Sequence, residues 1–367
     1  MRIAFYAPMK PPTHPVPSGD RRMARSFMAL LADLGHEVRL ASRFRSYDGR
    51  GDPERQARLA LLGGRLARRL LRRWHGEPPD LWFTYHLYHK SPDWLGPPVC
   101  DALGIPYVVA EASIAVKRAS GAWALGYSAS RAAIARADRV LAMTSHDLPA
   151  LRPVVRPGRL VLFPPFLDTR PFAVRTDASA SSVPVLLAVA MMRADVKRDS
   201  YRLLAAALSL LAELPWRLEI VGDGEARAEI VALFAAFGGR VRMHGAVPPA
   251  ALPPIYAAAD LYVWPAFNEA YGMALLEAQA AGLPVVAGRE GGVPDVVDDG
   301  VTGLLTEPRC VSAFAAAVRT LLLDPVRRRA MGAAALQRVL AHHALPAARA
   351  RLRAALADLR RPACASA

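Results

Sequence analysis

The chain has 367 residues, 53% of them hydrophobic and 22% charged, which is too long for one ordinary core and predicts two globular domains. No run of about 18 uncharged apolar residues occurs, and the first residues follow a strand pattern rather than a signal peptide, so we expect a cytoplasmic protein or one peripheral on the inner face of the membrane. Three widely spaced cysteines argue against a disulfide framework or a zinc site. The formal net charge of +15 at pH 7 favours anionic partners, namely nucleotide sugars, acidic lipid head groups or nucleic acid, but does not choose among them.

The first elements predict a parallel sheet. Residues 3–7 predict a strand, a proline-rich loop follows through Ser18 and Gly19, and residues 20–34 carry apolar side chains at helical spacing. A second strand follows at residues 36–41. Because strand, loop and helix alternate in this order, we expect helices on both faces of the sheet and the first loop at its carboxyl edge.

The segment Arg55 to Trp74 combines leucines with arginines. On a helical wheel the apolar side chains form one stripe and the arginines gather opposite it: Leu59, Leu62, Leu66, Leu70 and Trp74 against Arg58, Arg65, Arg68, Arg69 and Arg72. Such a helix can lie peripherally on an anionic membrane surface, with about 1 kcal/mol of attraction per cation, and would suit a lipid-linked acceptor. The alternative is a surface helix that packs its leucines on the sheet, and Gly63 with Gly64 weakens a long amphipathic helix. Both interpretations stay open.

The middle of the chain ends one series of strands and helices and begins another. An apolar strand ends at His86, and further apolar segments follow at residues 104–111 and 137–145. Pro164, Pro165, Pro171 and the polar tract Asp177–Ser182 then indicate a hinge. Strands of a second series are predicted at residues 185–189, 218–221 and 261–264.

Two glutamates, Glu269 and Glu277, flank the expected start of a helix after the strand at 261–264. The first N–H groups of that helix, from Tyr271, Gly272 and Met273, would form an anion site, and Gly272 would let a phosphate approach the backbone. Glu269 on the loop can accept hydrogen bonds from sugar hydroxyls, while Glu277 lies two turns further on, roughly 12 Å along the axis. This arrangement suits a sugar nucleotide lying between the two carboxylates.

The surrounding sequence resembles glycosyltransferase family 4, the group 1 glycosyltransferases, which are retaining enzymes. The resemblance is strong across about residues 183–331 and weaker over the N-terminal half. It is carried by I-V-G-D-G at Ile220 to Gly224, A-A-A-D-L-Y-V-W-P-A at Ala257 to Ala266, E-A-Y-G-M-A-L-L-E-A-Q-A-A-G-L-P-V-V-A at Glu269 to Ala287, and G-G-V-P-D-V-V-D-D-G-V-T-G-L-L at Gly291 to Leu305. In the first half, M-R-I-A-F-Y-A-P, G-H-E-V-R-L-A, G-I-P-Y-V-V-A-E and A-D-R-V-L-A-M-T-S follow the order of the family.

This resemblance implies the GT-B fold, in the α/β class, with two Rossmann-like doubly wound parallel-sheet domains that face each other across a cleft. We expect residues 1–170 to form an N-terminal acceptor domain and residues 183–344 a C-terminal domain for the nucleotide-sugar donor. The last helix, residues 345–360, is expected to cross back and join the first domain.

The resemblance also implies an activity, the transfer of a hexosyl unit from a UDP- or GDP-linked sugar to a hydroxyl of a glycan, a lipid or a small molecule. Arg193 and Lys197 match the arginine and lysine that hold the donor diphosphate, where fixed cations stabilise the charge of the leaving group. Glu269 is expected to bind the hexose and Glu277 the ribose. In such retaining transfers the acceptor attacks on the face of the leaving group, and no enzyme nucleophile is needed.

Three further residues are assigned to donor binding. Gly19 stands in the first loop, where these enzymes often have two adjacent glycines. Gly222 opens a Gly-Asp-Gly turn that lacks the third glycine of a nicotinamide-binding fingerprint, so we interpret it as a turn at the sheet edge whose backbone can touch the nucleotide. Asn268 directly precedes Glu269.

The N-terminal half departs from the family at one catalytic position. Glu111 is present, but Ala112 stands where the family has a histidine. His86 could approach the donor sugar instead, or it is a hydrogen-bonded histidine at a strand end without such a role, and Lys117 lies on the loop after Glu111. We predict no cofactor and no metal, because no Asp-x-Asp motif lies at a strand end of this site.

Other activities remain as alternatives. A nucleotide-sugar epimerase or a phosphorylase can share the GT-B fold. A nucleic-acid-binding protein is suggested only by the charge, and the chain has no basic stripe interleaved with aromatic residues, so we expect no nucleic-acid partner. The sequence leaves the sugar, the acceptor and the oligomeric state unspecified.

Overall fold

The computed structural model describes residues 1–16, 18–172 and 183–359. The chain forms two compact units: Met1–Phe163 together with residues 348–359 makes unit 1, and Pro164–Ala347 makes unit 2. Each unit contains one six-stranded sheet, and its paired strands are parallel. The expected α/β class with two Rossmann-like parallel sheets is therefore confirmed. The predicted hinge tract Asp177–Ser182 lies outside the described residues.

The sheet of unit 1 has the strand order β2-β1-β3-β4-β5-β6. Its strands are β1 (Arg2–Tyr6), β2 (Glu37–Leu40), β3 (Leu81–Leu87), β4 (Tyr107–Ala112), β5 (Arg139–Ala142) and β6 (Leu160–Leu162). The chain reverses its direction of travel through the sheet between β1 and β3. Ligands of doubly wound folds bind at the carboxyl ends of the strands on either side of such a switch point.

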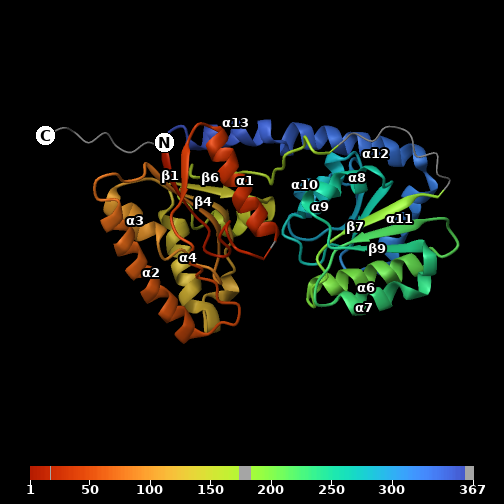
Figure 1. Ribbon diagram of the computed structural model, residues 1–367, viewed down its shortest axis with the longest axis horizontal. Coiled ribbons are helices and arrows are strands. Elements are labelled where there is room, and N and C mark those ends of the chain that lie inside the picture. The colour runs from red at the N-terminus through yellow and green to blue at the C-terminus, as the bar shows by residue number, and fades with distance from the viewer. Residues whose placement is uncertain (17, 173–182, 360–367) are drawn as a thin grey trace. The chain divides into compact units, whose positions relative to one another are not determined.

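The helices of unit 1 cover both faces of this sheet. They are α1 (Gly19–Asp33), α2 (Pro53–Arg73), α3 (Gly96–Leu103), α4 (Ala124–Arg136), α5 (Leu148–Leu151) and the part of α13 (Leu345–Leu356) from residue 348 onward. Figure 1 shows α2, α3 and α4 gathered on one side, and these three helices contact one another. An ion pair between Asp33 and Arg349 joins helix α1 to α13.

Helix α1 forms where the sequence predicts it. Ser18 is its N-cap, and the Ser18 hydroxyl accepts a hydrogen bond from the Arg21 N–H at 3.2 Å. The apolar stripe is buried on the sheet, with the Phe27 ring 5.4 Å from the ring of Phe83. The stripe thus contributes aromatic packing to the core, in addition to its buried apolar area.

Helix α2 is continuous from Pro53 to Arg73, although two glycines lie in its middle. Its N-cap is Asp52. Gly63 is buried and packs closely on Trp94, because a Cβ at this position would lie only 2.3 Å from the Trp94 side chain. The buried face consists of Gln56, Gly63, Ala67 and Leu70. This face is partly rotated from the predicted leucine stripe, since Leu62 of that stripe is 44% exposed, while Leu66 and Trp74 are partly buried against the core. The close approach of Trp94 at a glycine, which a count of leucines does not detect, accounts for the rotation.

The sheet of unit 2 has the strand order β12-β11-β10-β7-β8-β9, which is the Rossmann order. Its strands are β7 (Val185–Val189), β8 (Arg217–Val221), β9 (Val241–Gly245), β10 (Leu261–Trp264), β11 (Val285–Gly288) and β12 (Gly303–Thr306). Its helices are α6 (Val196–Ser209), α7 (Arg227–Phe234), α8 (Leu252–Ala257), α9 (Met273–Ala280), α10 (Val293–Val296), α11 (Val311–Leu323) and α12 (Pro325–Arg338). Figure 1 shows α6 and α7 packed together beside this sheet. The switch point lies between β7 and β10.

The chain enters and leaves unit 2 at neighbouring points. The Leu167 N–H donates to the carbonyl of His343 at 2.9 Å, and His343 Nδ1 lies 2.8 Å from the carbonyl oxygen of Pro165. His343 ends a π-helical turn, Val339–His343, that precedes α13. Unit 2 is therefore closed where its two ends meet.

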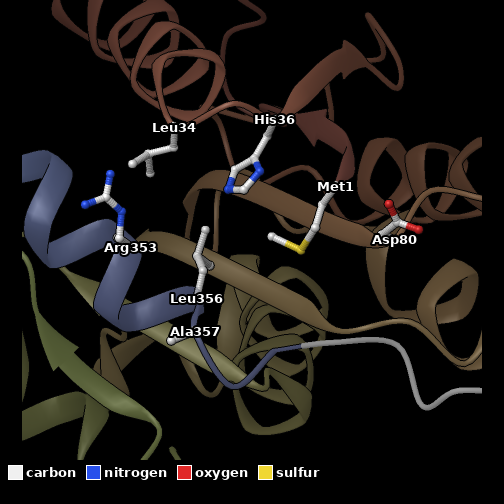
Figure 2. A pocket seen from close by; sticks show the side chains of 7 residues that line it. All are labelled: Met1, Leu34, His36, Asp80, Arg353, Leu356 and Ala357. Atoms are coloured by element: carbon white, nitrogen blue, oxygen red, sulfur yellow. The ribbon is translucent and has the colours of Figure 1, made fainter.

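A pocket of about 520 Å³ lies at the amino edge of the unit 1 sheet (Figure 2). Met1, His36 and Asp80 line it from just before three strands, and Arg353 and Leu356 line it from α13. Burial and the amino group of Met1 lower the pKa of His36. Because ligands of doubly wound sheets bind at the opposite, carboxyl edge, this pocket lies apart from the predicted site residues. Among the residues that the structure describes, no helix has the length and hydrophobicity needed to span a bilayer.

Candidate functional site

Two loops of unit 2 follow adjacent strands at the switch point. Residues 190–195 connect β7 to α6, and residues 265–272 connect β10 to α9. Because both loops start at the carboxyl ends of neighbouring parallel strands, they lie where a doubly wound sheet binds its ligand. The predicted residue Arg193 lies on the first connection, and Lys197 lies in the first turn of α6 that follows it. Asn268, Glu269 and Tyr271–Gly272 belong to the second connection.

Lys197 and Glu269 form an ion pair across these two loops. Asp195 caps α6 by accepting the Lys197 N–H at 2.9 Å, which fixes the lysine in the first turn of the helix. The Lys197 ammonium also lies 5.5 Å from the centre of the Trp264 ring. Only 21% of the Lys197 side chain and 19% of the Glu269 side chain are exposed. The two predicted ligand groups therefore neutralise each other in a largely buried site.

The loop at residues 265–272 has an unusual backbone. Ala266, Asn268 and Gly272 have φ values of 61°, 48° and 76°, in the left-handed region that residues other than glycine rarely adopt. Hydrogen bonds hold this conformation: the Asn268 N–H donates to the Glu290 carboxylate at 2.6 Å, and the Gly292 N–H donates to a carbonyl of the loop at 2.7 Å. The loop is thus fixed by contacts inside unit 2.

Gly272 is required by the fold of the loop itself. It caps α9, and a Cβ at this position would come within 2.7 Å of the Leu275 side chain and 3.3 Å of the Glu269 side chain. The N–H groups of Leu275 and Leu276 donate to the Gly272 carbonyl, at 2.9 and 3.3 Å, so the N–H groups that a ligand could use are those of Met273 and Ala274. Tyr271 beside them is 7% exposed. An anion at this turn stays a prediction.

Glu277 lies in the middle of α9 and is 3% exposed. The Tyr256 hydroxyl donates a hydrogen bond of 2.9 Å to its carboxylate. Tyr256 is itself buried, with its ring stacked 6.2 Å from that of Tyr262. Tyr256 therefore orients the carboxylate that we predicted to bind a ribose, and that assignment stays a prediction.

Arg193 lies on the loop after β7 and is half-buried. One guanidinium nitrogen is 3.2 Å from the Met191 sulfur, and the described residues provide no carboxylate that pairs with it. Glu225 accepts the neighbouring Ala194 N–H at 3.0 Å, and this bond, together with the charge of Arg193, lowers the Glu225 pKa. The guanidinium is thus available to an anionic ligand.

A glycine is needed at position 222 for a packing reason that the sequence did not reveal. A Cβ at this position would come within 1.9 Å of the Ala190 carbonyl oxygen, and a Cβ at Gly224 would come within 2.3 Å of the Met192 carbonyl oxygen. The Met192 N–H donates to the Asp223 carbonyl at 2.9 Å. The two glycines therefore let the loop after β8 pack on the loop after β7, which carries Arg193.

Gly19 differs from these glycines. It opens α1 after β1, and among the described residues beyond its own helix backbone and chain neighbours no atom lies within 4 Å of a Cβ placed there. The packing of unit 1 therefore gives no reason for a glycine at this position, which leaves room for an approaching ligand.

His86, Asp20 and Glu111 come together in unit 1. His86 and Glu111 are the penultimate residues of β3 and β4, with φ values of 61° and 56°. Asp20 follows Gly19 at the start of α1. His86 Nδ1 lies 2.9 Å from the Asp20 carboxylate and 3.8 Å from that of Glu111. The structure thus brings three side chains together at the carboxyl edge of the sheet. His86 and Glu111 were predicted site residues, and Asp20 was not.

The charges of this cluster are coupled. Burial alone would lower the pKa of His86, but the negative charges of Glu111 and Asp20 outweigh it and raise the pKa to about 9. Burial raises the pKa of Glu111, and the bond to His86 lowers that of Asp20 against the effect of its own burial. His86 is therefore an imidazolium at neutral pH, which can donate hydrogen bonds to a ligand but cannot accept a proton.

Sequence reasoning missed three residues of these clusters. Asp20 carried no distinguishing signal, because acidic residues are common in the first turn of a helix. Asp147 contributes negative charge to His86 from the loop after β5, and Tyr256 orients Glu277 from a helix that precedes it in the chain. Within residues 1–16, 18–172 and 183–359, no group of three His, Cys, Asp or Glu side chains is arranged to hold a metal ion.

The chain is similar to known proteins over much of its length. A family model described as Glycosyl transferases group 1 matches residues 183–324. A D-inositol 3-phosphate glycosyltransferase of Kineococcus radiotolerans is 37% identical over 232 residues, which cover 55% of this chain and 53% of that protein. The chain therefore spans about half the length of this curated relative.

Solved structures share the fold over nearly the whole chain. A sucrose-phosphate synthase from Thermosynechococcus elongatus has a TM-score of 0.76 at 22% identity, covering 96% of this chain and 97% of its own. Anabaena Alr3699/HepE, solved in complex with UDP and glucose, has a TM-score of 0.71 at 17% identity, covering 98% of this chain and 100% of its own. At these identities the likeness shows the fold, and the fold is GT-B.

Proposed function

Because residues 183–324 belong to the group 1 glycosyl transferases and the chain has the GT-B fold, we propose that this protein is a retaining glycosyltransferase. It moves a hexosyl unit from a UDP- or GDP-linked sugar to the hydroxyl of an acceptor. The bond between the anomeric carbon and the diphosphate oxygen breaks, and its electrons leave with the nucleoside diphosphate. The acceptor oxygen bonds to the same face of the anomeric carbon, and its proton passes to the departing diphosphate.

The Lys197–Glu269 pair carries this proposal. A donor diphosphate competes with Glu269 for the Lys197 ammonium, and the released carboxylate then accepts hydrogen bonds from the hexose. Arg193 on the neighbouring loop adds a second cation for the charge that develops on the leaving group. The Anabaena neighbour, which was solved with UDP and glucose, supports a UDP-linked donor.

Further donor contacts come from the loop at 265–272 and from α9. Asn268 and Tyr271 lie on that loop, and the N–H of Met273 opens the helix for a phosphate. Glu277 binds the ribose with its carboxylate oriented by Tyr256. Gly222 contributes by holding the loop of Arg193 in place.

In unit 1, we assign His86 and Glu111 to the binding of a sugar. The imidazolium donates a hydrogen bond to a sugar hydroxyl, and Gly19 allows close approach of the ligand at the start of α1. Ala112 lies where the family has a histidine, so the cation at His86 supplies the polar contact from the neighbouring strand.

Calorimetry with UDP, GDP and ADP tests the donor site. A hydrogen bond to a charged group contributes roughly 1.5–3 kcal/mol, so Glu277→Ala should weaken binding of the preferred nucleotide about tenfold to a hundredfold. Tyr256→Phe is the matched control, because it removes the bond inside the protein while keeping the carboxylate, and it should lose much less affinity. Unchanged affinity in Glu277→Ala would remove the ribose assignment.

Product analysis by NMR tests the reaction. Retention predicts that donor and product have the same anomeric configuration. Conversion of the donor sugar without an acceptor would indicate an epimerase instead, and a requirement for inorganic phosphate would indicate a phosphorylase.

The acceptor side also has a surface suited to an anionic membrane. Helix α2 exposes Leu61 and Leu62 beside arginines that are themselves exposed: Arg55, Arg58, Arg65, Arg68, Arg69, Arg72 and Arg73. We propose that this face binds acidic lipids peripherally. In vesicle flotation, wild type should bind phosphatidylglycerol vesicles and Leu61→Asp/Leu62→Asp should not, with the exposed pair Val326→Asp/Leu323→Asp of unit 2 as the control. Equal binding by both double variants would contradict it.

A further inference from the structure

A cluster of basic and aromatic side chains lies in unit 1 beyond the His86 site. We call it the Trp123 cluster, and it consists of His89, Lys90, Lys117, Arg118 and Trp123. His89 and Lys90 follow β3, in a turn closed by the Ser91 N–H to the Tyr88 carbonyl at 2.8 Å. The other three lie in two short 3₁₀ turns after β4, Val116–Arg118 and Gly121–Trp123. The cluster therefore sits at the carboxyl edge of two adjacent strands.

Trp123 is the centre of the cluster. The Arg118 guanidinium lies 4.4 Å from the centre of its ring, and the Lys90 ammonium lies 5.3 Å from it. The His89 ring meets it edge-on at 5.8 Å. Cation contacts with an aromatic face hold the cations in place without neutralising their charge.

A second feature of the cluster is its uncompensated positive charge: among the described residues, no carboxylate forms an ion pair with Lys90, Lys117 or Arg118. Burial and the charges of these three side chains lower the pKa of His89 to about 4, so the imidazole is neutral at pH 7. Neither ring nitrogen of His89 has a hydrogen-bond partner, although both are buried. Three like charges around a neutral imidazole repel one another, and an anion would relieve this repulsion.

The cluster is built into the fold rather than carried on a mobile surface. Gln56 donates to the Ala122 carbonyl at 2.8 Å and accepts the Gly126 N–H at 3.1 Å. The Trp123 indole N–H donates to the Asp48 carbonyl at 3.3 Å. Gly126 leaves room for the His89 carbonyl, which would lie 2.1 Å from a Cβ there. The turn that holds Trp123 is thus fixed against α2 and against the loop of His89.

Aromatic contacts connect the cluster with the His86 site. The His86 ring lies 5.0 Å from the Tyr88 ring, which in turn lies 5.3 Å from the His89 ring. A ligand bound at Trp123 would therefore be a near neighbour of a sugar at His86, inside unit 1. A phosphate monoester carries a charge of about −1.5 to −2 at pH 7 and three acceptor oxygens, which suits several unpaired cations better than a carboxylate.

We propose that the Trp123 cluster binds a phosphate monoester carried by the acceptor, with Trp123 packing against the acceptor ring and Lys90 and Arg118 holding the phosphate. The assignment of this ligand as the acceptor rests on the proposed glycosyltransferase function. Phosphate binding itself does not, so it can be tested without the donor.

The test uses ¹⁹F NMR of protein labelled with 5-fluorotryptophan. The chain has six tryptophans, so six ¹⁹F resonances are expected. The Trp123 resonance is assigned by its loss in Trp123→Phe. Titration with glucose 6-phosphate should shift this resonance, whereas glucose should not. Removing one charged hydrogen-bonding partner costs about tenfold in affinity, so Lys90→Gln/Arg118→Gln should bind roughly a hundredfold more weakly.

Matched controls separate a site from general charge. Arg131→Gln/Arg152→Gln removes two exposed arginines elsewhere in unit 1 and should bind glucose 6-phosphate as the wild type does. Arg118→Lys keeps the charge and should retain most of the affinity. Equal weakening by both double variants, or no shift of the Trp123 resonance by any phosphate probe, would overturn the proposal.

Two further probes identify the chemistry of the anion. Glucuronate that binds as tightly as glucose 6-phosphate would overturn the phosphate assignment in favour of a carboxylate. A Trp123 shift with phosphatidic acid vesicles and none with glucose 6-phosphate would support the subsite and place its phosphate on a lipid. UDP binding is measured on the same sample. If UDP binds and no phosphate probe shifts the Trp123 resonance, only the present inference is refuted. If a phosphate probe shifts this resonance and UDP does not bind, only the proposed donor site is refuted.

Discussion

The protonated state of His86 gives a prediction that rests on geometry inside unit 1. Its imidazole faces the carboxylates of Asp20 and Glu111, at 2.9 and 3.8 Å, and receives further negative charge from Asp147. Lys10 and Tyr85 face the same carboxylates from neighbouring elements. The perturbation is His86→Asn, because asparagine also tolerates a positive φ but carries no charge.

The magnitude follows from the raised pKa. A histidine with a pKa of about 6.5 unfolded and about 9 folded gains about 2.5 pKa units, each worth 1.36 kcal/mol, so the charge stabilises unit 1 by up to about 3 kcal/mol. Because the folded pKa is raised, this contribution is fully present below pH 6.5 and is lost as the pH rises through about 9. Most of it is therefore present at pH 7.

Two measurements check this prediction. The Hε1 resonance that disappears in His86→Asn should titrate with a midpoint near pH 9 in the wild type. In urea unfolding, the free-energy difference between wild type and His86→Asn should shrink between pH 6.5 and pH 10, leaving only the part due to the lost hydrogen bond. A midpoint at or below pH 6.5, or a free-energy difference that does not change with pH, would refute the reasoning.

Two other predictions concern glycines and the ion pair. Gly222→Ala places a methyl group 1.9 Å from the Ala190 carbonyl oxygen and should lower the unfolding free energy by about 1–3 kcal/mol. Gly19→Ala has open space around the new methyl group, so it should keep full thermal stability but weaken ligand binding. Thermal unfolding and calorimetry of the two variants check this, and equal stability losses would contradict the distinction. Glu269→Gln frees Lys197 from its partner and should bind free UDP at least as tightly as the wild type while losing sugar transfer, as calorimetry and a transfer assay would show. Weaker UDP binding by Glu269→Gln would mean that the carboxylate does not compete with the diphosphate.

Much of the fold could be predicted because the hydrophobic pattern changes sharply at its boundaries. Strands 185–189 and 261–264 were predicted with the bounds that the structure has, since each is a short apolar run between turn residues. The helix ending at Ala280 was likewise marked by Gly272 before it and Gly282 after it. The rotation of α2 was beyond prediction, because it depends on contact with Trp94, which lies outside the helix.

The candidate site was predicted only where the residues form a local motif. Glu269 and Lys197 are 72 positions apart, and their pairing depends on the adjacency of β7 and β10 in the sheet. The partners of His86 likewise come from α1 and β4. Of the Trp123 cluster only Lys117 was noted in the sequence, because the five residues come from two loops and their lack of acidic partners among the described residues is a property of the folded unit.

The closure of unit 2 between its two ends has a consequence for how the protein is made. Unit 2 is inserted within unit 1, so the residues that complete unit 1 are the last of the described chain to leave the ribosome. Arg139 must wait for Asp358, its partner 219 positions later, and at about 5–20 residues per second this delay lasts roughly 10–40 s. During that interval the surface that Leu352 and Leu356 later cover is open. All residues of unit 2 are therefore synthesised before the last described residues of unit 1, whereas in a chain of consecutive domains the N-terminal domain is completed first.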